Sequence, residues 1–421
     1  MPAGSRYVYS GGFATYPQQQ LPIAYYSKEA NKTFFCYGGV AKGKQSLLHM
    51  VSYYDHATGM VPRPTILLDK RTADAHDNPV LTLDKHGYVW VFSNAHGTSR
   101  QAYISRSRRP YRVDEFERVA TTNFSYGQPW YLPGQGFLFL HTRYQGSHRI
   151  LYWMTSADGI QWSEPHELAH AAYGHYQVSN RRGGRVATMF NYHPSKPPYS
   201  LARTNLYYME TRDMGRTWLG VDGKALSIPL HEVHNPALVH DYESEGLLVF
   251  LKDLQFDAQG RPVLLYLTSK KIIPAAENGP FAWHTARWTG REWQIRDFTT
   301  SDNCFDFGSL YIEADGTWRI IAPTAPGPDP YWTGGDMVMW TSRNRGDSWE
   351  KVRQLTHDTR FHHTYARRPV NAHPDFYALW ADGDAKQPSE SRLYFTNQKG
   401  THVWRLPVEM TKDFQRPEVI D

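Results

Sequence analysis

The sequence predicts an all-β fold: a seven-bladed β-propeller of four-stranded antiparallel blades, with residues 1–421 forming a single domain. Three observations predict it. A pattern of strand, tight turn, strand, loop and aromatic strand recurs seven times, the composition is 14% aromatic with 32 Gly and 27 Pro, and Asp-box motifs follow several repeats. Length alone would suggest two or three domains, but repeat folds are the exception to that estimate.

The clearest repeat spans His76 to Arg106. HDNPVLTLDKHGYVWVFSNAHG predicts a first strand, a turn at Asp84–Gly87 and a second strand that ends near Ser93, and QAYISRS supplies the third strand. A spacing of about 40–60 residues is typical of propeller blades, and the 3.6-residue periodicity of helical repeats is absent. The other six copies begin at residues 21, 128, 176, 234, 308 and 368.

Asp-box motifs lie just after the third strand. Residues 211–218 (TRDMGRTW) and 342–349 (SRNRGDSW) match the full pattern, and residues 156–162 (SADGIQW) are a shortened copy. The Asp or Asn caps a tight turn, Gly takes a positive φ, and Trp packs between blades. These motifs predict the fold and say little about substrate.

Charge and composition limit the partners. The net charge is +5 and the cations are rich in Arg, which suits carboxylate or sulfate groups, although simple solubility explains the same charge. No basic run predicts nucleic-acid binding, and no apolar stretch approaches the roughly 20 residues that span a membrane.

Two cysteines cannot form a disulfide framework, and the start MPAGSRYVYS lacks an apolar signal region. We nevertheless expect a secreted or periplasmic protein whose signal peptide is absent from this sequence, and a monomer.

One rim of the propeller is expected to carry the active site. The start of each first strand and the end of each second strand meet at the same edge of a blade. First strands begin at His76, Tyr126, His175, His234, Cys304 and His363. Second strands end at His96, Tyr144, Tyr192 and His193, and Asp74, Asp77, Asp253 and Asp306 are the nearest acids. The alternative is that each His caps its own strand.

Arginines recur on the same rim, a few residues before the third strand: Arg100, Arg149, Arg203, Arg261 and Arg392. Arg forks could hold an anionic polymer, or each Arg could brace its own loop or stack on an aromatic ring. We expect Arg149 and Arg203 to be the better candidates for binding.

The residue types on the rim favour one reaction. Phosphate-binding loops, the G-x-S-x-G elbow and HExxH are absent, and the rim offers no pair of carboxylates of the kind glycosidases use. A His/Tyr/Arg group suits β-elimination on a uronic acid. That reaction needs a cation beside the carboxylate, a base for the C5 proton and an acid for the leaving O4.

Residues 74–149 resemble the BNR-type propeller polysaccharide lyases, above all the ulvan lyases of lyase families twenty-four and twenty-five, and the likeness extends through the seven repeats. The resemblance implies His76 and His96 as the catalytic histidines, Tyr144 as the catalytic tyrosine and Arg149 as the neutralising arginine. It also implies Tyr192 as a tyrosine lining the canyon, and Arg143 or Arg203 could replace Arg149. Tyr144 or His76 would be the base and the other the acid. Nearby cations are expected to lower the pKa of Tyr144.

The resemblance also implies a metal in some members. His234, Cys304 and His363, with His175 as a possible fourth ligand, would suit a structural zinc ion if the propeller brings them together, and the chemistry itself requires no cofactor. The alternative is that they are polar plugs hydrogen-bonded within the channel mouth.

Three rival functions remain. Propeller enzymes that release rhamnose linked to glucuronic acid share this fold and face, and only product analysis separates hydrolysis from elimination. A sialidase needs three arginines, a Tyr nucleophile with Glu, and an Asp acid, a set that cannot be assembled here. A carbohydrate-binding propeller without catalysis predicts that His96→Ala changes no reaction.

Overall fold

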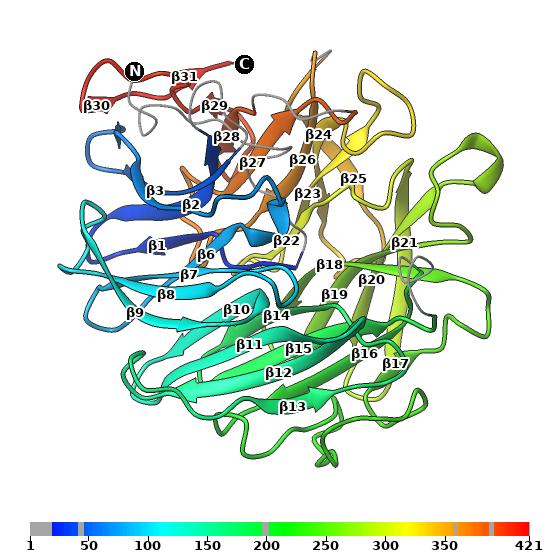
Figure 1. Cartoon of the computed structure of the whole chain (residues 1–421). Helices are drawn as coiled ribbons and strands as arrows, with labels where there is room; N and C mark the ends of the chain where they lie inside the picture. The colour runs from blue at the N-terminus through cyan, green and yellow to red at the C-terminus, as the bar shows by residue number, and fades with distance from the viewer. Residues whose placement is uncertain (1–18, 41–45, 196–201, 358–359, 387–390, 421) are drawn as a thin grey trace.

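A computed structural model describes residues 19–40, 46–195, 202–357, 360–386 and 391–420, so the start MPAGSRYVYS lies outside the described residues. Seven antiparallel sheets follow one another in chain order, six with four strands and the last with five. In Figure 1 the colour passes round the molecule from blue through green to orange and red, and the last blade lies beside the first. The predicted seven-bladed β-propeller is confirmed.

Blades one to four are consecutive in the chain. Blade one consists of β1 (Ala24–Ser27), β2 (Lys32–Val40), β3 (Leu47–Asp55) and β5 (Thr65–Asp69). Blade two consists of β6 (Pro79–Leu83), β7 (Val89–Ser93), β8 (Ala102–Ser107) and β9 (Phe116–Thr122). Blade three consists of β10 (Ser125–Leu132), β11 (Gly136–Gln145), β12 (His148–Ser156) and β13 (His166–Ala169). Blade four consists of β14 (Gln177–Arg182), β15 (Arg185–Tyr192), β16 (Thr204–Thr211) and β17 (Leu238–His240).

The remaining blades complete the ring. Blade five consists of β18 (Leu248–Phe256), β19 (Pro262–Ser269), β20 (Phe281–Trp288) and β21 (Trp293–Ser301). Blade six consists of β22 (Ser309–Ile312), β23 (Trp318–Ala325), β24 (Asp336–Ser342) and β25 (Glu350–Gln354). Blade seven consists of β26 (His362–Arg367), β27 (Ala378–Gly383), β28 (Leu393–Thr396), β29 (Val403–Arg405) and β31 (Glu418–Val419).

The first strand of each blade is innermost. First strands of neighbouring blades contact each other, as β6 does with β10 and β14 with β18, and β6 and β10 are buried along their whole length. Of the fourth strands, β25 is largely exposed and β21 is partly buried. Apolar residues on both faces of the inner strands therefore form the core between blades, and the loops before these strands reach the channel rim.

The prediction for blade five is wrong by one strand. Residues 238–240, expected in its first strand, form β17, which pairs with β16 as the outer strand of blade four. The first strand of blade five is β18, the segment predicted as its second strand. His234 therefore lies at the outer edge of blade four, where its side chain is 68% exposed, and does not begin an inner strand.

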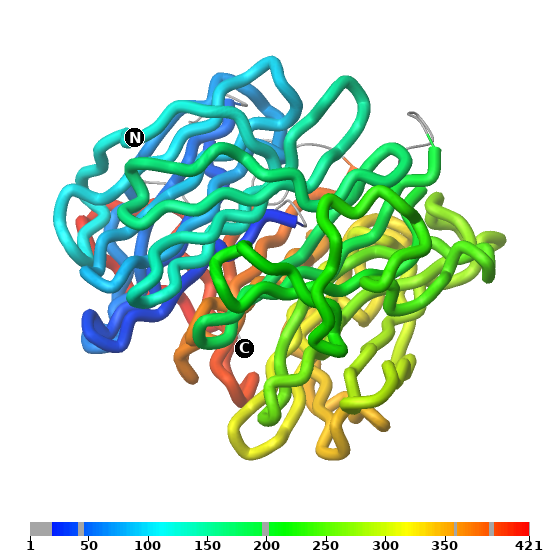
Figure 2. Tube along the Cα trace, turned by 90° about the horizontal axis from the view of Figure 1, so that it is seen from below, coloured from blue at the N-terminus to red at the C-terminus, as the bar shows by residue number. Residues whose placement is uncertain are grey.

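Two short contacts close the ring between its ends. The backbone N–H of Tyr26 donates to the Val370 carbonyl at 2.9 Å, and that of Val370 donates to the Ala24 carbonyl at the same distance. Strands β4 (Val61–Pro62) and β30 (Phe414–Gln415) also pair. The two end blades otherwise take their strands from opposite ends of the chain, and Figure 2 shows blue and red segments side by side. Within the described ranges, no helix has the length and apolar character to cross a membrane.

Candidate active site

A single carboxylate at the head of blade two holds both predicted histidines. Asp74 caps the short 3-10 helix η2 (Ala75–Asp77) by accepting from the His76 backbone N–H at 3.0 Å. Its two oxygens lie 2.7 Å from His76 Nδ1 and 3.0 Å from His96 Nδ1. Because a carboxylate only accepts, both Nδ1 atoms carry the proton, and each Nε2 keeps its lone pair when the ring is neutral. The rings stack with centroids 4.3 Å apart.

Asp74 is held in turn by Arg100. The guanidinium donates to Asp74 Oδ2 at 2.8 Å and to both oxygens of the buried Asp77, which Lys70 also approaches. Burial works to raise the pKa of Asp74, but hydrogen bonds from the two histidines outweigh it and keep that pKa well below its usual range. The predicted substrate-binding Arg100 therefore braces the acids beneath the histidines.

Tyr144 is the centre of the cluster. It lies directly opposite Arg149 in the β11–β12 pair, and Arg149 Nε donates to its hydroxyl oxygen at 3.1 Å. The same oxygen lies 3.1 Å from His96 Nε2 and 3.3 Å from the Tyr126 hydroxyl. Since His96 Nε2 offers a lone pair, the Tyr144 O–H donates to it. Strand pairing thus places the cation, the phenol and the imidazole around one oxygen atom.

Tyr126 contacts this oxygen, and Tyr176 packs against Tyr126. Tyr126 has φ of 52° at an irregular point in the β10–β11 pairing, and a bulge of this kind redirects a side chain. Its ring meets Tyr176 edge-on at 5.2 Å. The guanidinium groups of Arg149 and Arg203 lie 5.2 and 4.8 Å from the centre of the Tyr176 ring. Tyr176 therefore packs against two cations, of which Arg149 also contacts Tyr144.

The pKa of Tyr144 differs from the one predicted. Burial and the neighbouring Tyr176 raise the pKa of Tyr144 to about 12, and Arg149 only partly offsets this, so the prediction of a lowered pKa is wrong for the free site. Burial lowers the pKa of His76. Burial also works to lower the pKa of Arg149, but Tyr176, Tyr144 and Tyr126 outweigh it and raise that pKa. At neutral pH the cluster holds a neutral Tyr144, a neutral His76 and a charged Arg149.

The other predicted binding residues occupy different places. Arg143 precedes Tyr144 in β11 and so faces the other side of the sheet, with its guanidinium 5.9 Å from the Tyr152 ring. Arg203 belongs to the cluster through Tyr176. Tyr192 is 2% exposed in the core of blades three and four, where it packs against Tyr207, so the structure places it outside the group around Tyr144.

The four predicted zinc ligands are not brought together. In the described part of the chain, groups of three or more potential metal ligands form at two places, and neither includes His234, Cys304, His363 or His175. His175 uses both ring nitrogens on the backbone, accepting from the Ala171 N–H and contacting the Asn191 carbonyl. His363 accepts from Trp380 Nε1 at 3.0 Å, and burial raises the pKa of the Cys304 thiol to about 11. The two buried histidines thus match the alternative of hydrogen-bonded polar plugs.

One of the two possible ligand groups is the site itself, Asp74, His76 and His96. A cation there would compete with Arg100 for the Asp74 carboxylate. Tyr176 is a member of the site that was not among the predicted residues. The available signal was its position at the head of a first strand, which Tyr126 occupies in blade three.

Fold and site together define a seven-bladed propeller with a His/Tyr/Arg centre on one rim. The chain belongs to the BNR repeat-containing family, whose model matches residues 23–301. It is 24% identical over 348 residues to an ulvan lyase of Nonlabens ulvanivorans, covering 74% of this chain and 72% of that protein. It is also 24% identical over 288 residues to an ulvan lyase of Pseudoalteromonas sp. (strain PLSV), covering 58% of each.

Solved structures agree on the fold. A PL25 ulvan lyase superposes with a TM-score of 0.74 at 18% identity, covering 94% of this chain and 96% of that one. The polysaccharide lyase Uly1 superposes with a TM-score of 0.64 at 11% identity, covering 90% of each chain. The predicted resemblance to propeller polysaccharide lyases is confirmed.

Proposed function

We propose that this protein is a polysaccharide lyase that cleaves an anionic, uronate-containing polysaccharide by β-elimination, with Tyr144, His76, His96 and Arg149 as its catalytic group. The observation that carries the proposal is the convergence of Arg149, His96 and Tyr126 on the Tyr144 hydroxyl within 3.3 Å. Arg149 contacts this oxygen and shares the Tyr176 ring with Arg203, and a uronate carboxylate is the kind of group that arginine forks bind.

The protonation states suggest how the steps are divided. Arg149, with Arg203 nearby, neutralises the uronate carboxylate and so acidifies the C5–H bond. Neutral His76, oriented through its Nδ1 proton by Asp74, accepts the C5 proton on Nε2. Tyr144, which keeps its proton because its pKa is about 12, donates that proton to the departing O4. His96, which accepts from the Tyr144 hydroxyl, orients the phenol. The site returns to its starting state when His76 releases the C5 proton to water and the Tyr144 phenolate takes a proton from water.

The relatives suggest the substrate. Two of them are ulvan lyases, and one solved PL25 ulvan lyase, similar to this chain with a TM-score of 0.74, is bound to -[GlcA(1-4)Rha3S]-. Glucuronate and sulfate are both anions, which fits the paired cations at Tyr176. We propose an ulvan-like sulfated polysaccharide cleaved at the uronate O4.

The test is incubation with ulvan while ultraviolet absorbance is followed. Elimination leaves an unsaturated uronate that absorbs, whereas hydrolytic release of rhamnose does not. We expect absorbance to rise with the native chain and with His86→Ala, a control at an exposed position. The rise should be lost with Tyr144→Phe and with His76→Ala, while the melting temperature of both variants stays unchanged. New reducing ends without absorbance would favour a hydrolase, and binding without either product would favour a carbohydrate-binding propeller.

A further inference from the structure

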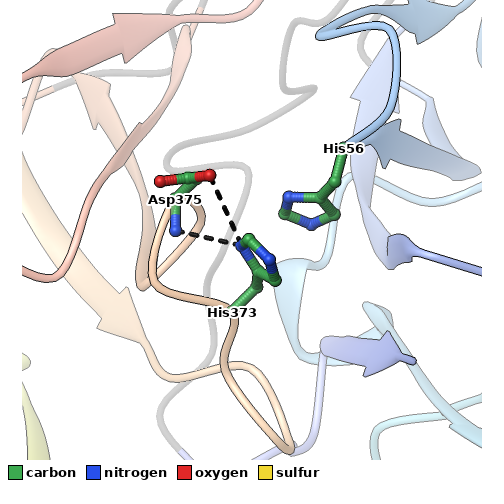
Figure 3. Close-up of side chains that lie close together, drawn as sticks. All are labelled: His56, His373 and Asp375. Atoms are coloured by element: carbon green, nitrogen blue, oxygen red, sulfur yellow. Dashed lines mark hydrogen bonds and ion pairs between the residues drawn. The ribbon is translucent and has the colours of Figure 1, made fainter.

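A second cluster of potential metal ligands lies where the first and last blades meet. His56 follows β3 of blade one, while His373 and Asp375 lie in the turn before β27 of blade seven. The centroids of the two imidazole rings are 3.8 Å apart. Figure 3 shows the rings facing each other across the junction, with the Asp375 carboxylate beside His373. The turn is fixed by a hydrogen bond from the Phe376 N–H to the His373 carbonyl.

We propose that His56, His373 and Asp375 bind one divalent transition-metal ion of the zinc class, which links blade one to blade seven. One ligand atom from each residue can be chosen so that all three lie within 4.8 Å of one another. Two imidazoles and one carboxylate are ligands that zinc accepts, and water would complete a four-coordinate site.

His56 is prepared for this role by its surroundings. Its Nε2 lies 2.8 Å from the hydroxyl of the buried Thr33. When Nε2 donates to that hydroxyl, Nδ1 carries the lone pair, and Nδ1 is buried without a hydrogen-bond partner in the described part of the protein. An imidazole fixed through one nitrogen, with a bare second nitrogen, has the arrangement of a metal ligand. A buried polar atom without a partner otherwise has an energetic cost.

His373 and Asp375 complete the set. Nδ1 of His373 accepts from the Asp375 N–H at 3.1 Å and lies 3.8 Å from Asp375 Oδ2. An ion bound at Nδ1 would therefore replace the Asp375 N–H as the partner of that lone pair, next to the carboxylate that would share the ion. Ligand atoms about 2.0–2.2 Å from zinc would be drawn somewhat closer together than this, and the Asp375 side chain, 68% exposed, is free to adjust.

Aromatic side chains pack around the two imidazoles. Tyr26 packs against both rings at 4.8 and 5.3 Å, and Tyr54 packs against His56 at 5.0 Å. These rings hold the imidazoles in place from two sides.

The experiment titrates metal-free, tag-free protein with zinc chloride in a calorimeter and follows the melting temperature in parallel. All variants are made and titrated in the His96→Ala protein, because this change removes a ligand from the other possible metal group, Asp74, His76 and His96. We expect one zinc ion per chain and a higher melting temperature with zinc. Affinity should fall at least about tenfold with His373→Ala and with Asp375→Asn, and stay unchanged with the surface control His86→Ala.

Asp375→Asn keeps the test decisive if His373→Ala fails to fold, because an exposed carboxylate contributes little to stability. Cobalt(II) provides an independent readout, since loss of its visible absorption bands in Asp375→Asn assigns the carboxylate as a ligand. Absence of zinc binding, or binding that both variants leave unchanged, would overturn the proposal. The readouts do not depend on lyase activity, so this proposal and the proposed function can fail separately.

Discussion

At the scale of single residues, the site depends on a carboxylate that touches no substrate. Asp74 accepts from Nδ1 of both histidines and from Arg100. It sets the same tautomer in both rings and keeps them stacked. His76 and His96 should therefore lose function together when Asp74 is changed, although neither histidine is itself altered.

The first prediction concerns that group. Asp74→Asn removes one of the two acceptor oxygens, so at least one histidine loses its orientation, and we expect kcat/KM on ulvan to fall on the order of 10- to 100-fold with little change in folding. Asp74 also raises the pKa of His76, against the larger effect of burial. The acidic limb of the pH–rate profile should therefore move to lower pH in the variant. An unchanged profile with full activity would contradict a positioning role, and Asp222→Asn, an exposed turn acid, is the control.

At the scale of elements, the β11–β12 pair makes the chemistry possible by placing Tyr144 directly opposite Arg149. Side chains opposite each other in an antiparallel pair interact directly, whereas neighbours along one strand face opposite sides. This geometry decides between Arg149 and Arg143 for the contact to the tyrosine. The loop before β12 is short because the two strands form a hairpin.

The second prediction tests that pair. Arg149→Lys loses the Nε donor to Tyr144, and Tyr144→Phe loses the acceptor, so each change should lower kcat/KM by on the order of 100-fold or more. Because both act through one contact, the double variant should be much less impaired than the product of the two single losses. Measured losses that simply multiply would show that the two residues work independently.

The Asp-box turns are a second kind of element, and their role is structural. Asp213 accepts from the Thr217 N–H at 2.8 Å and the Thr211 hydroxyl at 3.0 Å, while Gly215 has φ of 84°. A Cβ atom at Gly215 would lie 2.6 Å from the ring of Trp153. The motif therefore combines a capped turn with a close approach to an aromatic ring.

The third prediction follows from these contacts. Asp213→Ala should lower the free energy of unfolding by about 1–2 kcal/mol, and Gly215→Ala by more, because the added methyl group meets both backbone strain and the Trp153 ring. Urea denaturation measures both. Activity per folded molecule should be unchanged, and a selective loss of activity in Asp213→Ala would assign these turns a role that we do not expect.

Sequence reasoning succeeded where the repeat itself carries the information. Turn residues and alternating apolar residues identify blades, and equivalent positions then place His76, His96 and Tyr144 on one rim. It failed where two repeats could be aligned one strand apart. Residues 238–240 look like a first strand because their apolar residues and turn follow the pattern, yet they pair with β16 as an outer strand. His234, which precedes them, was therefore also predicted in the wrong place. Protonation depended on burial around Tyr144, which no spacing reveals.

At the scale of the whole molecule, the propeller buries many histidines in neutral form. His141, His175 and His363 are at most 2% exposed, and burial lowers their pKa values to about 3, 4 and 3. In the unfolded chain each would have a pKa near 6.5. Between these values the unfolded chain binds more protons than the folded one, so protonation favours unfolding as the pH falls.

The fourth prediction is a steep loss of stability in mild acid. Each depressed histidine contributes stability that is present above pH 6.5 and is lost as the pH falls toward its folded pKa, at a rate that approaches about 1.4 kcal/mol per pH unit per group. The free energy of unfolding from urea melts should therefore change little between pH 8 and 7 and fall clearly between pH 6 and 4.5. His141→Gln should flatten this slope, because Gln does not titrate, whereas the exposed His86→Ala should leave the slope as it is. A slope that persists in full without the buried histidine would assign the acid sensitivity to the carboxylates, whose stabilising pairs break at lower pH.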